Sequence, residues 1–103
     1  MKYENWLFGK NGALFKASAN GNLELLKELL AEGANINIIS QNGYTPLHRA
    51  AQNGHTSTVE FLLSNGANAK VESKDRETPM TLAVKNGRSD IEAILRKYMA
   101  NNE

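Results

Sequence analysis

Residues 45–55 have the sequence TPLHRAAQNGH, and this stretch decides the fold. Thr45 is a favourable helix N-cap, because its hydroxyl can accept a hydrogen bond from a free backbone amide of the first turn. Pro46 then occupies the first helical position, where its missing N–H costs nothing. Asn53-Gly54 ends the helix, since both residue types tolerate the left-handed conformation found at helix C-termini. The stretch therefore predicts one short helix followed by a tight turn.

A second, longer helix is predicted directly after this turn. Both helices carry apolar residues at the spacing i, i+3 and i+4, which places them on one face. These residues are Leu47, Ala50 and Ala51 in the first helix and Val59, Leu62 and Leu63 in the second. Asn65-Gly66 ends the second helix. The polar residues 67–77 lack helical periodicity, and we expect them to form an extended or turn-like projecting loop.

This pattern recurs along the chain with a period of 33 residues. Asn-Gly occurs at 20–21, 53–54 and 86–87, and Thr-Pro occurs at 45–46 and 78–79. Small or apolar residues also recur at the same spacing, namely Leu14, Leu47 and Met80, then Ala17, Ala50 and Ala83, then Leu29, Leu62 and Leu95. One such unit cannot bury its apolar stripe alone, so the units must stack. The sequence predicts an all-α solenoid of stacked helix-turn-helix units.

The segment NGYTPLHRAAQNGHTSTVEFLLSNGAN, residues 42–68, resembles an ankyrin repeat, whose motif contains T-P-L-H-x-A at a period of 33. The resemblance implies a single ankyrin-repeat domain over residues 1–103, with β-turn loops that project from the stacked helix pairs. The expected repeats span residues 7–39, 40–72 and 73–100. The second matches the motif nearly throughout, the third matches it through TPMTLAVKNG, and the first lacks the T-P-L-H tetrapeptide.

The two terminal repeats are expected to cap the stack. Residues 12–15, GALF, replace the tetrapeptide in the first repeat, and we expect Trp6–Phe8 to fold over its exposed end, with an exposed partner-binding patch as the alternative. In the last repeat Glu92 and Arg96 replace apolar residues of the earlier units. A polar outer face is what a terminal repeat needs for solubility, so we expect a complete three-repeat protein.

Composition narrows the classes of protein further. Twelve basic and eleven acidic residues give a net charge of +1, which offers no electrostatic case for nucleic acid or a membrane as the main partner. Without cysteine there is no disulfide, no thiol nucleophile and no Cys-ligated zinc. No apolar run reaches the length of a spanning helix, and the N-terminus lacks the features of a signal peptide. We therefore expect a soluble cytoplasmic protein.

The two histidines, His48 and His55, are the candidates for chemistry. They are seven residues apart, but the Asn53-Gly54 turn separates them, and zinc requires three or four protein ligands. The chain has neither a G-x-S-x-G elbow nor a phosphate-binding loop. The resemblance implies instead that His48 links Thr45 to the backbone of the adjacent repeat and that His55 stabilises the turn. We expect no enzyme activity, no cofactor and no metal.

The resemblance further implies a protein-binding module that uses its loop tips and the exposed, concave side of its first helices. The expected contact residues are Gln41, Asn42, Tyr44, Lys74, Asp75, Arg76 and Glu77 in the loops, and Arg49, Gln52 and Lys85 on the helices, with Lys16 in the first repeat. Tyr44 is expected to contribute most, because Tyr and Arg are enriched at binding hot spots. The predicted function is a monomeric adaptor or inhibitor. The alternative is a structural, engineered or self-associating scaffold, joined through Trp6, Phe8 or Phe61.

Overall fold

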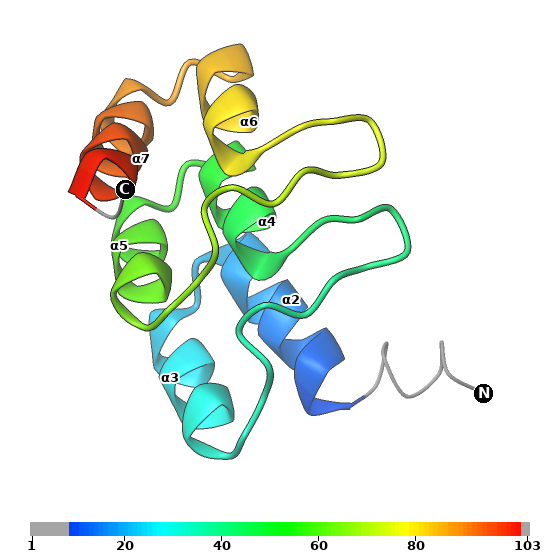
Figure 1. Cartoon of the computed structure of the whole chain (residues 1–103). Coiled ribbons are helices and arrows are strands. Elements are labelled where there is room, and N and C mark those ends of the chain that lie inside the picture. The colour runs from blue at the N-terminus through cyan, green and yellow to red at the C-terminus, as the bar shows by residue number, and fades with distance from the viewer. Residues whose placement is uncertain (1–8, 102–103) are drawn as a thin grey trace.

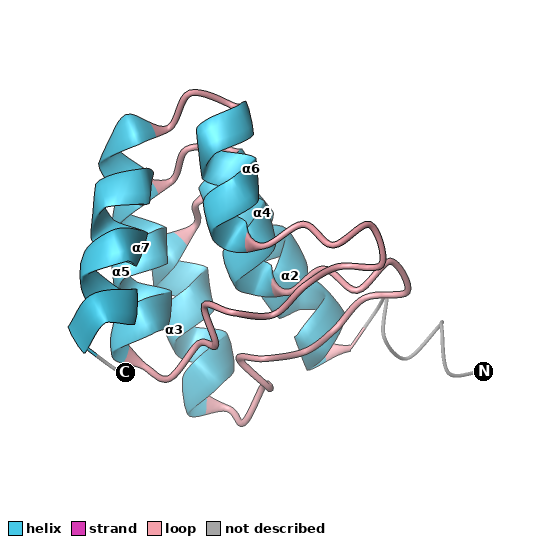
Figure 2. Cartoon of the chain, turned by 45° about the horizontal axis from the view of Figure 1, so that its top comes forward, coloured by secondary structure: helices cyan, strands magenta, loops and turns pink. Residues whose placement is uncertain are grey.

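The computed structural model describes residues 9–101, and this part of the chain forms six α-helices and no strand. In chain order the helices are α2 (Lys10–Asn20), α3 (Leu23–Ala31), α4 (Pro46–Gln52), α5 (Thr56–Ser64), α6 (Pro79–Lys85) and α7 (Ser89–Asn101). Three consecutive pairs stack so that α2, α4 and α6 form one row and α3, α5 and α7 form a second (Figure 1). The loops before α4 and α6 extend outward beyond the first row (Figure 2). The predicted all-α solenoid is confirmed.

The two Thr-Pro helices begin as the sequence predicts. The Thr45 hydroxyl accepts a hydrogen bond from the His48 backbone amide at 3.3 Å, and Pro46 occupies the first helical position. The Thr78 hydroxyl caps α6 in the same way, by accepting from the Thr81 amide at 3.1 Å. Each cap satisfies one amide that the helix leaves without an intrahelical partner, which stabilises the helix by roughly 1 kcal/mol.

The first helix lacks this start signal and begins earlier relative to the repeat. Pro46 corresponds to Ala13, yet α2 begins at Lys10 and is 11 residues long, against 7 residues in α4. Its N-cap, Gly9, provides no side-chain hydrogen bond. Without a proline to fix the first turn, the helix continues upstream. Trp6–Phe8, which were expected to cover this end, lie outside the described residues.

The apolar core lies between the two rows of helices and runs through the whole stack. Its buried members are Leu14, Ala17, Leu26, Leu29, Leu47, Ala50, Ala51, Val59, Leu62, Leu63, Ala83, Ile91 and Leu95. Burying one leucine side chain contributes roughly 1.5–3 kcal/mol, so contact between units is the main source of stability. The recurring alanines at 17, 50 and 83 are almost fully buried, as expected where helices approach closely.

The last helix, α7, has one apolar and one polar side. Ile91 and Leu95 are buried, whereas Glu92 and Arg96 form an ion pair along its outer side. The polar outer face that the sequence predicts for the last repeat is therefore confirmed. Helix α7 also continues through Met99. The equivalent residues of the two earlier units are Gly33 and Gly66, which lie after the ends of α3 and α5.

Side chains of one unit bind the turn of the unit before it. The His55 Nε2 lies 2.9 Å from the Ala19 carbonyl oxygen, and the Arg88 Nε donates to the Gln52 carbonyl at 3.2 Å. Both side chains lie against a turn glycine of the preceding unit. A Cβ built on Gly21 would come within 2.5 Å of the His55 ring, so no larger residue fits there without displacing it.

Candidate partner-binding surface

The row formed by α2, α4 and α6, together with the loop tips 41–44 and 74–77, is called the inner surface here (Figure 1). All eleven residues predicted as contact residues lie on these elements. The exposed ones are Lys16, Gln41, Asn42, Lys74, Asp75, Arg76 and Lys85, and the half-buried ones are Tyr44, Arg49, Gln52 and Glu77. The 33-residue period therefore places them on one side of the stack, although their role in binding stays a prediction.

The two loops are joined by side chains where they meet the helices. The Tyr44 hydroxyl donates a hydrogen bond to the Glu77 carboxylate, whose other oxygen lies 3.5 Å from the Lys85 ammonium nitrogen. The hydrogen bond from Tyr44 is the main cause that lowers the pKa of Glu77, and the same bond raises the pKa of Tyr44. At neutral pH Glu77 is therefore a carboxylate and Tyr44 keeps its proton.

Arg49 is held between two aromatic rings. Its guanidinium carbon lies 4.5 Å from the centre of the Tyr44 ring and 5.7 Å from that of Phe15, which belongs to α2. One guanidinium nitrogen also donates to the side-chain oxygen of Gln52 at 2.8 Å. Cation–π contacts and an amide acceptor thus orient this cation without neutralising its charge. Phe15, Tyr44, Arg49 and Gln52 are called the Arg49 cluster below.

Phe15 is the one member of the Arg49 cluster that the sequence does not predict as a partner contact. It belongs to GALF, the stretch that replaces the T-P-L-H tetrapeptide. It occupies the position of His48 one repeat earlier, next to the predicted contact residue Lys16. A large aromatic residue at this point on the first-helix row was the signal that could have identified it.

His48 has a structural role below this cluster. Its side chain is fully buried, its Nδ1 accepts from the Thr45 amide at 3.1 Å, and its Nε2 lies 2.8 Å from the Glu77 carbonyl oxygen. Because Nδ1 accepts, Nε2 carries the proton and donates it to that carbonyl. The Tyr44 ring stacks on the imidazole at 5.1 Å. The prediction that His48 links Thr45 to the next repeat is confirmed.

Stability should depend on the titration of His48. Burial is the main cause that lowers the pKa of its imidazole, against the opposing effect of the hydrogen bond to the Glu77 carbonyl. The unfolded chain, where this group titrates near pH ~6.5, then binds more protons than the folded chain below that pH. The neutral His48 imidazole therefore contributes fully to the free energy of unfolding above about pH 6.5. This contribution is lost as the pH falls towards the lower pKa of the folded state.

We therefore expect the urea midpoint to fall as the pH is lowered below about 6.5, and to fall less in a His48→Gln variant. The stability that the ionised Glu77 side chain contributes is lost at still lower pH, because the pKa of that carboxyl lies below its ordinary value near 4.5. If the urea midpoints of the wild type and the variant fall in parallel as the pH is lowered, His48 is not the group responsible for the loss of stability.

The loop tips are fixed by backbone hydrogen bonds. The Ser40 amide donates to the Tyr44 carbonyl at 2.8 Å, and the Ser73 amide donates to the Glu77 carbonyl at 2.8 Å, so each loop is closed in the same way. The Lys74 amide donates to the Asn42 carbonyl at 3.0 Å, which joins one tip to the next. The predicted contact residues on the tips therefore have defined positions relative to each other.

Arg76 has a strained backbone at the second tip. Its φ angle is +63°, and the equivalent residue of the first tip is Gly43, with a φ of +84°. A side chain in this left-handed region costs roughly 1 kcal/mol or more relative to glycine. The Arg76 side chain is exposed and makes no hydrogen bond or ion pair with any residue between 9 and 101.

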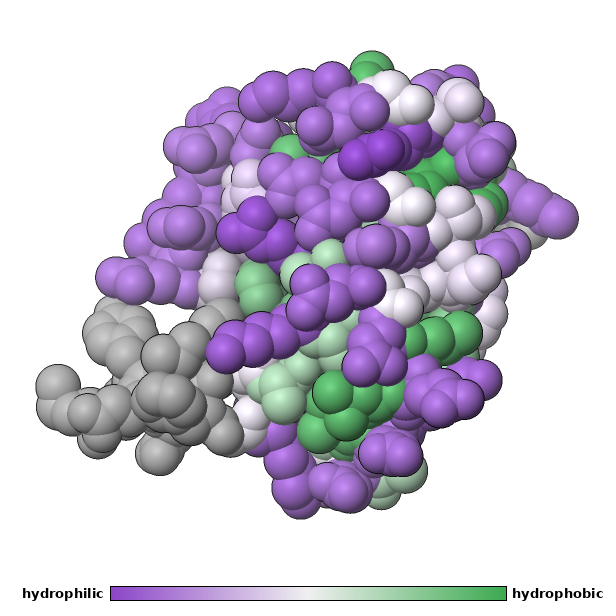
Figure 3. All heavy atoms as spheres, turned by 180° about the vertical axis from the view of Figure 1, so that it is seen from behind, coloured by the Kyte–Doolittle hydropathy of each residue, from purple (hydrophilic) through white to green (hydrophobic). Residues whose placement is uncertain are grey.

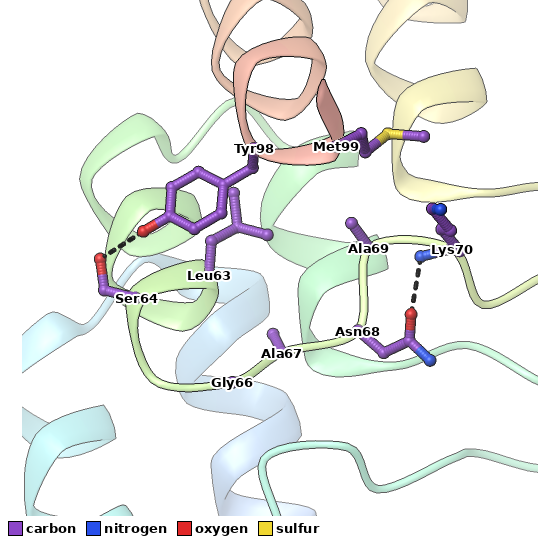
Figure 4. A pocket seen from close by; sticks show the side chains of 9 residues that line it. All are labelled: Leu63, Ser64, Gly66, Ala67, Asn68, Ala69, Lys70, Tyr98 and Met99. Atoms are coloured by element: carbon purple, nitrogen blue, oxygen red, sulfur yellow. Dashed lines mark hydrogen bonds between the residues drawn. The ribbon is translucent and has the colours of Figure 1, made fainter. Parts of the chain in front are cut away.

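A pocket lies away from the inner surface (Figure 4). It has a volume of about 570 Å³ and lies between the end of α5, the loop 66–70 and the end of α7, with Tyr98 and Met99 on its wall. Between the first two units the equivalent loop is joined to the next unit, because the Asn37 side chain donates a hydrogen bond to the Gly66 carbonyl at 3.2 Å. The pocket remains because α7 continues as a helix where a loop follows α5.

The pocket offers little chemistry. Its lining residues are Leu63, Ser64, Gly66, Ala67, Asn68, Ala69, Lys70, Tyr98 and Met99. The Tyr98 and Ser64 hydroxyls bond each other at 2.9 Å, and Lys70 is the only charged residue of the lining. No acid–base pair converges there. Within residues 9–101 no group of three His, Cys, Asp or Glu side chains could hold a metal ion, and none of the described helices is long and apolar enough to cross a membrane.

Comparison with protein families gives a match to ankyrin repeats, in three copies, over residues 14–103. The chain therefore belongs to the ankyrin-repeat family. Ankyrin repeats are generally protein–protein interaction modules and are typically non-catalytic, and the match contains no other kind of domain. Comparison with curated proteins gives no match.

Proposed function

We propose that this chain is a non-catalytic adaptor or inhibitor that acts as a cytoplasmic monomer and binds one protein partner on its inner surface. The observation that carries the proposal is the Arg49 cluster with its neighbour Glu77. These side chains come from two helices and two loops, are half-buried, and are already oriented by contacts with one another. Ordering them before binding lowers the entropy lost when a partner docks. The repeat bounds 7–39, 40–72 and 73–100 are part of this proposal.

The backbone conformation of Arg76 independently supports the proposal that the partner binds on the inner surface. Glycine would relieve the backbone strain at this position, and the Arg76 side chain forms no polar contact with the part of the chain that the structure describes. Strained residues persist mainly where the side chain has a role in function. We therefore place Arg76 among the partner contacts at the loop tips, together with Lys74 and Asp75.

Site-specific photo-crosslinking tests this proposal. A benzophenone amino acid replaces Gln52 on the inner surface, and in the matched control it replaces Glu60, which is exposed on α5 in the second row. We expect a partner protein to crosslink at Gln52 and not at Glu60, and a Tyr44→Ala substitution in the same chain to abolish the product. Crosslinking at Glu60 alone, or a product insensitive to Tyr44→Ala, would show that binding occurs elsewhere.

A self-associating scaffold is the second candidate, and one observation favours it. On the face shown in Figure 3, hydrophobic atoms gather at the lower end of the stack, over the α2–α3 pair. Leu25, on α3, has 37% of its surface exposed. Phe61, named earlier as an alternative contact, is half-buried with Lys27 5.6 Å from its ring centre. Light scattering should show a monomer, whereas a dimer that Leu25→Glu dissociates would establish the scaffold.

A further inference from the structure

We propose that the partner presents an acidic peptide segment and that Arg49 binds one of its carboxylates. This inference rests on the proposed function, because it names the chemistry of the partner for the same surface. It is carried by two observations. Charge is divided between the two rows of helices, and the Arg49 guanidinium is oriented without a counter-ion from residues 9–101.

The division of charge is hidden by the net charge of +1. On the inner surface the basic residues are Lys10, Lys16, Arg49, Lys74, Arg76 and Lys85, and the acidic residues are Asp75 and Glu77. The second row, α3, α5 and α7, has the opposite balance. Its basic residues are Lys27, Arg96 and Lys97, and its acidic residues are Glu24, Glu28, Glu60, Asp90 and Glu92. The inner surface is therefore the electropositive side, which attracts an acidic partner during encounter.

The two acidic residues of the inner surface do not neutralise its centre. Glu77 already accepts from Tyr44 and pairs with Lys85, and Asp75 lies at the exposed tip of the second loop. No carboxylate within residues 9–101 lies within ion-pair distance of Arg49. A half-buried guanidinium has lost part of its hydration, and a carboxylate from outside would restore its electrostatic partner.

The geometry of Arg49 suits a carboxylate in particular. Tyr44 and Phe15 contact the guanidinium through their rings and Gln52 accepts from one of its nitrogens, so the planar group is fixed while other N–H donors remain available. A fixed guanidinium can bind both oxygens of one carboxylate at once. The two rings beside it favour an apolar or aromatic neighbour of that carboxylate in the partner segment.

A nucleic acid fits this surface less well. Binding to a phosphate backbone requires several cations arranged along the strand, whereas Asp75 and Glu77 interrupt the basic residues of the second loop. The acidic residues of the second row would add repulsion.

The probe is a capped peptide of alternating Glu and Tyr, and the matched control is the same peptide with Gln in place of Glu. NMR spectra of the nitrogen-15-labelled full chain follow the Arg49 side-chain Nε–Hε signal and the backbone amides. We expect the Glu peptide to shift the signals of Arg49, Tyr44 and Gln52 and the Gln peptide to leave them unchanged. Arg49→Gln should weaken binding by about tenfold or more, and Arg49→Lys should weaken it to an intermediate extent.

Arg96→Gln is the control variant, because Arg96 lies on α7 in the second row and pairs with Glu92. It should leave peptide affinity unchanged. Equal binding of the Glu and Gln peptides, shifts confined to the second row, or no shift at Arg49 would each overturn the inference. So would a single-stranded oligonucleotide that displaces the Glu peptide from Arg49 at lower concentration.

The two proposals can fail separately. If a partner crosslinks at Gln52 through a segment without Asp or Glu, the acidic-segment inference is wrong and the adaptor function stands. If no partner crosslinks at Gln52 although the Glu peptide binds at Arg49, the adaptor function is wrong and the anion-binding property of Arg49 stands.

Discussion

Replacing His48 by alanine is expected to lower the free energy of unfolding by about 3 kcal/mol. The side chain is fully buried and joins two repeats, so its removal has three consequences. The Thr45 amide loses its acceptor, the Glu77 carbonyl loses its donor, and a cavity forms beneath the Tyr44 ring. An unsatisfied buried polar group costs roughly 1–3 kcal/mol, and the lost packing adds to that cost.

His55→Ala is the matched comparison, because it removes the same side chain from a less buried position. His55 is half-buried, and its side chain forms one hydrogen bond within residues 9–101, to the Ala19 carbonyl, so we expect a loss of about 1 kcal/mol. Urea unfolding followed by circular dichroism measures both variants. In thermal melts each 1 kcal/mol corresponds to a shift of roughly 4–8 °C. Equal losses at the two positions would mean that His48 does not link the repeats as described.

The second large effect is expected at Gly43, where alanine should destabilise the protein by about 2–3 kcal/mol. Gly43 has a φ of +84°, and a Cβ built there would lie 2.9 Å from the Lys74 nitrogen and 3.0 Å from the Ser73 Cα. These atoms belong to the backbone of the next loop and cannot rotate away. The loop must shift, which breaks the hydrogen bond from the Lys74 amide to the Asn42 carbonyl.

Gly66→Ala separates the steric clash from the backbone strain. Gly66 has a φ of +95°, but nothing lies within 4 Å of a Cβ built there, so only the strain of about 1 kcal/mol applies. Urea unfolding gives the difference between the variants, and hydrogen exchange of the Lys74 amide shows whether the tip-to-tip hydrogen bond is lost. If the two glycines tolerate alanine equally well, the loops do not pack as closely as the structure shows.

Much of the fold could be predicted because its signals are local and repeated. Thr45 and Pro46 fix where a helix begins, Asn53-Gly54 fixes where it ends, and the period of 33 shows that the units stack. The start of α2 at Lys10 could not be predicted in this way, because GALF contains no residue that prevents the helix from extending upstream.

The candidate site was predicted in position but not in geometry. The period indicates that Tyr44, Arg49 and Glu77 lie on the same side of the stack. It does not give the rotation of one unit against the next, which determines that Arg49 lies between the rings of Phe15 and Tyr44. The strained φ of Arg76 was also missed, since its equivalence to Gly43 becomes informative only when both loops have the same backbone conformation.

The links between repeats also affect how readily binding can change during evolution. His48, His55 and Arg88 each bond a backbone carbonyl of a neighbouring unit, belonging to Glu77, Ala19 and Gln52 respectively. Every residue type has such a carbonyl, so substitutions of the Gln52 or Glu77 side chain leave these links available. At these positions the backbone maintains the stack, and the side chain lies on the proposed partner-binding surface. We therefore expect single substitutions there to change binding specificity without loss of the fold.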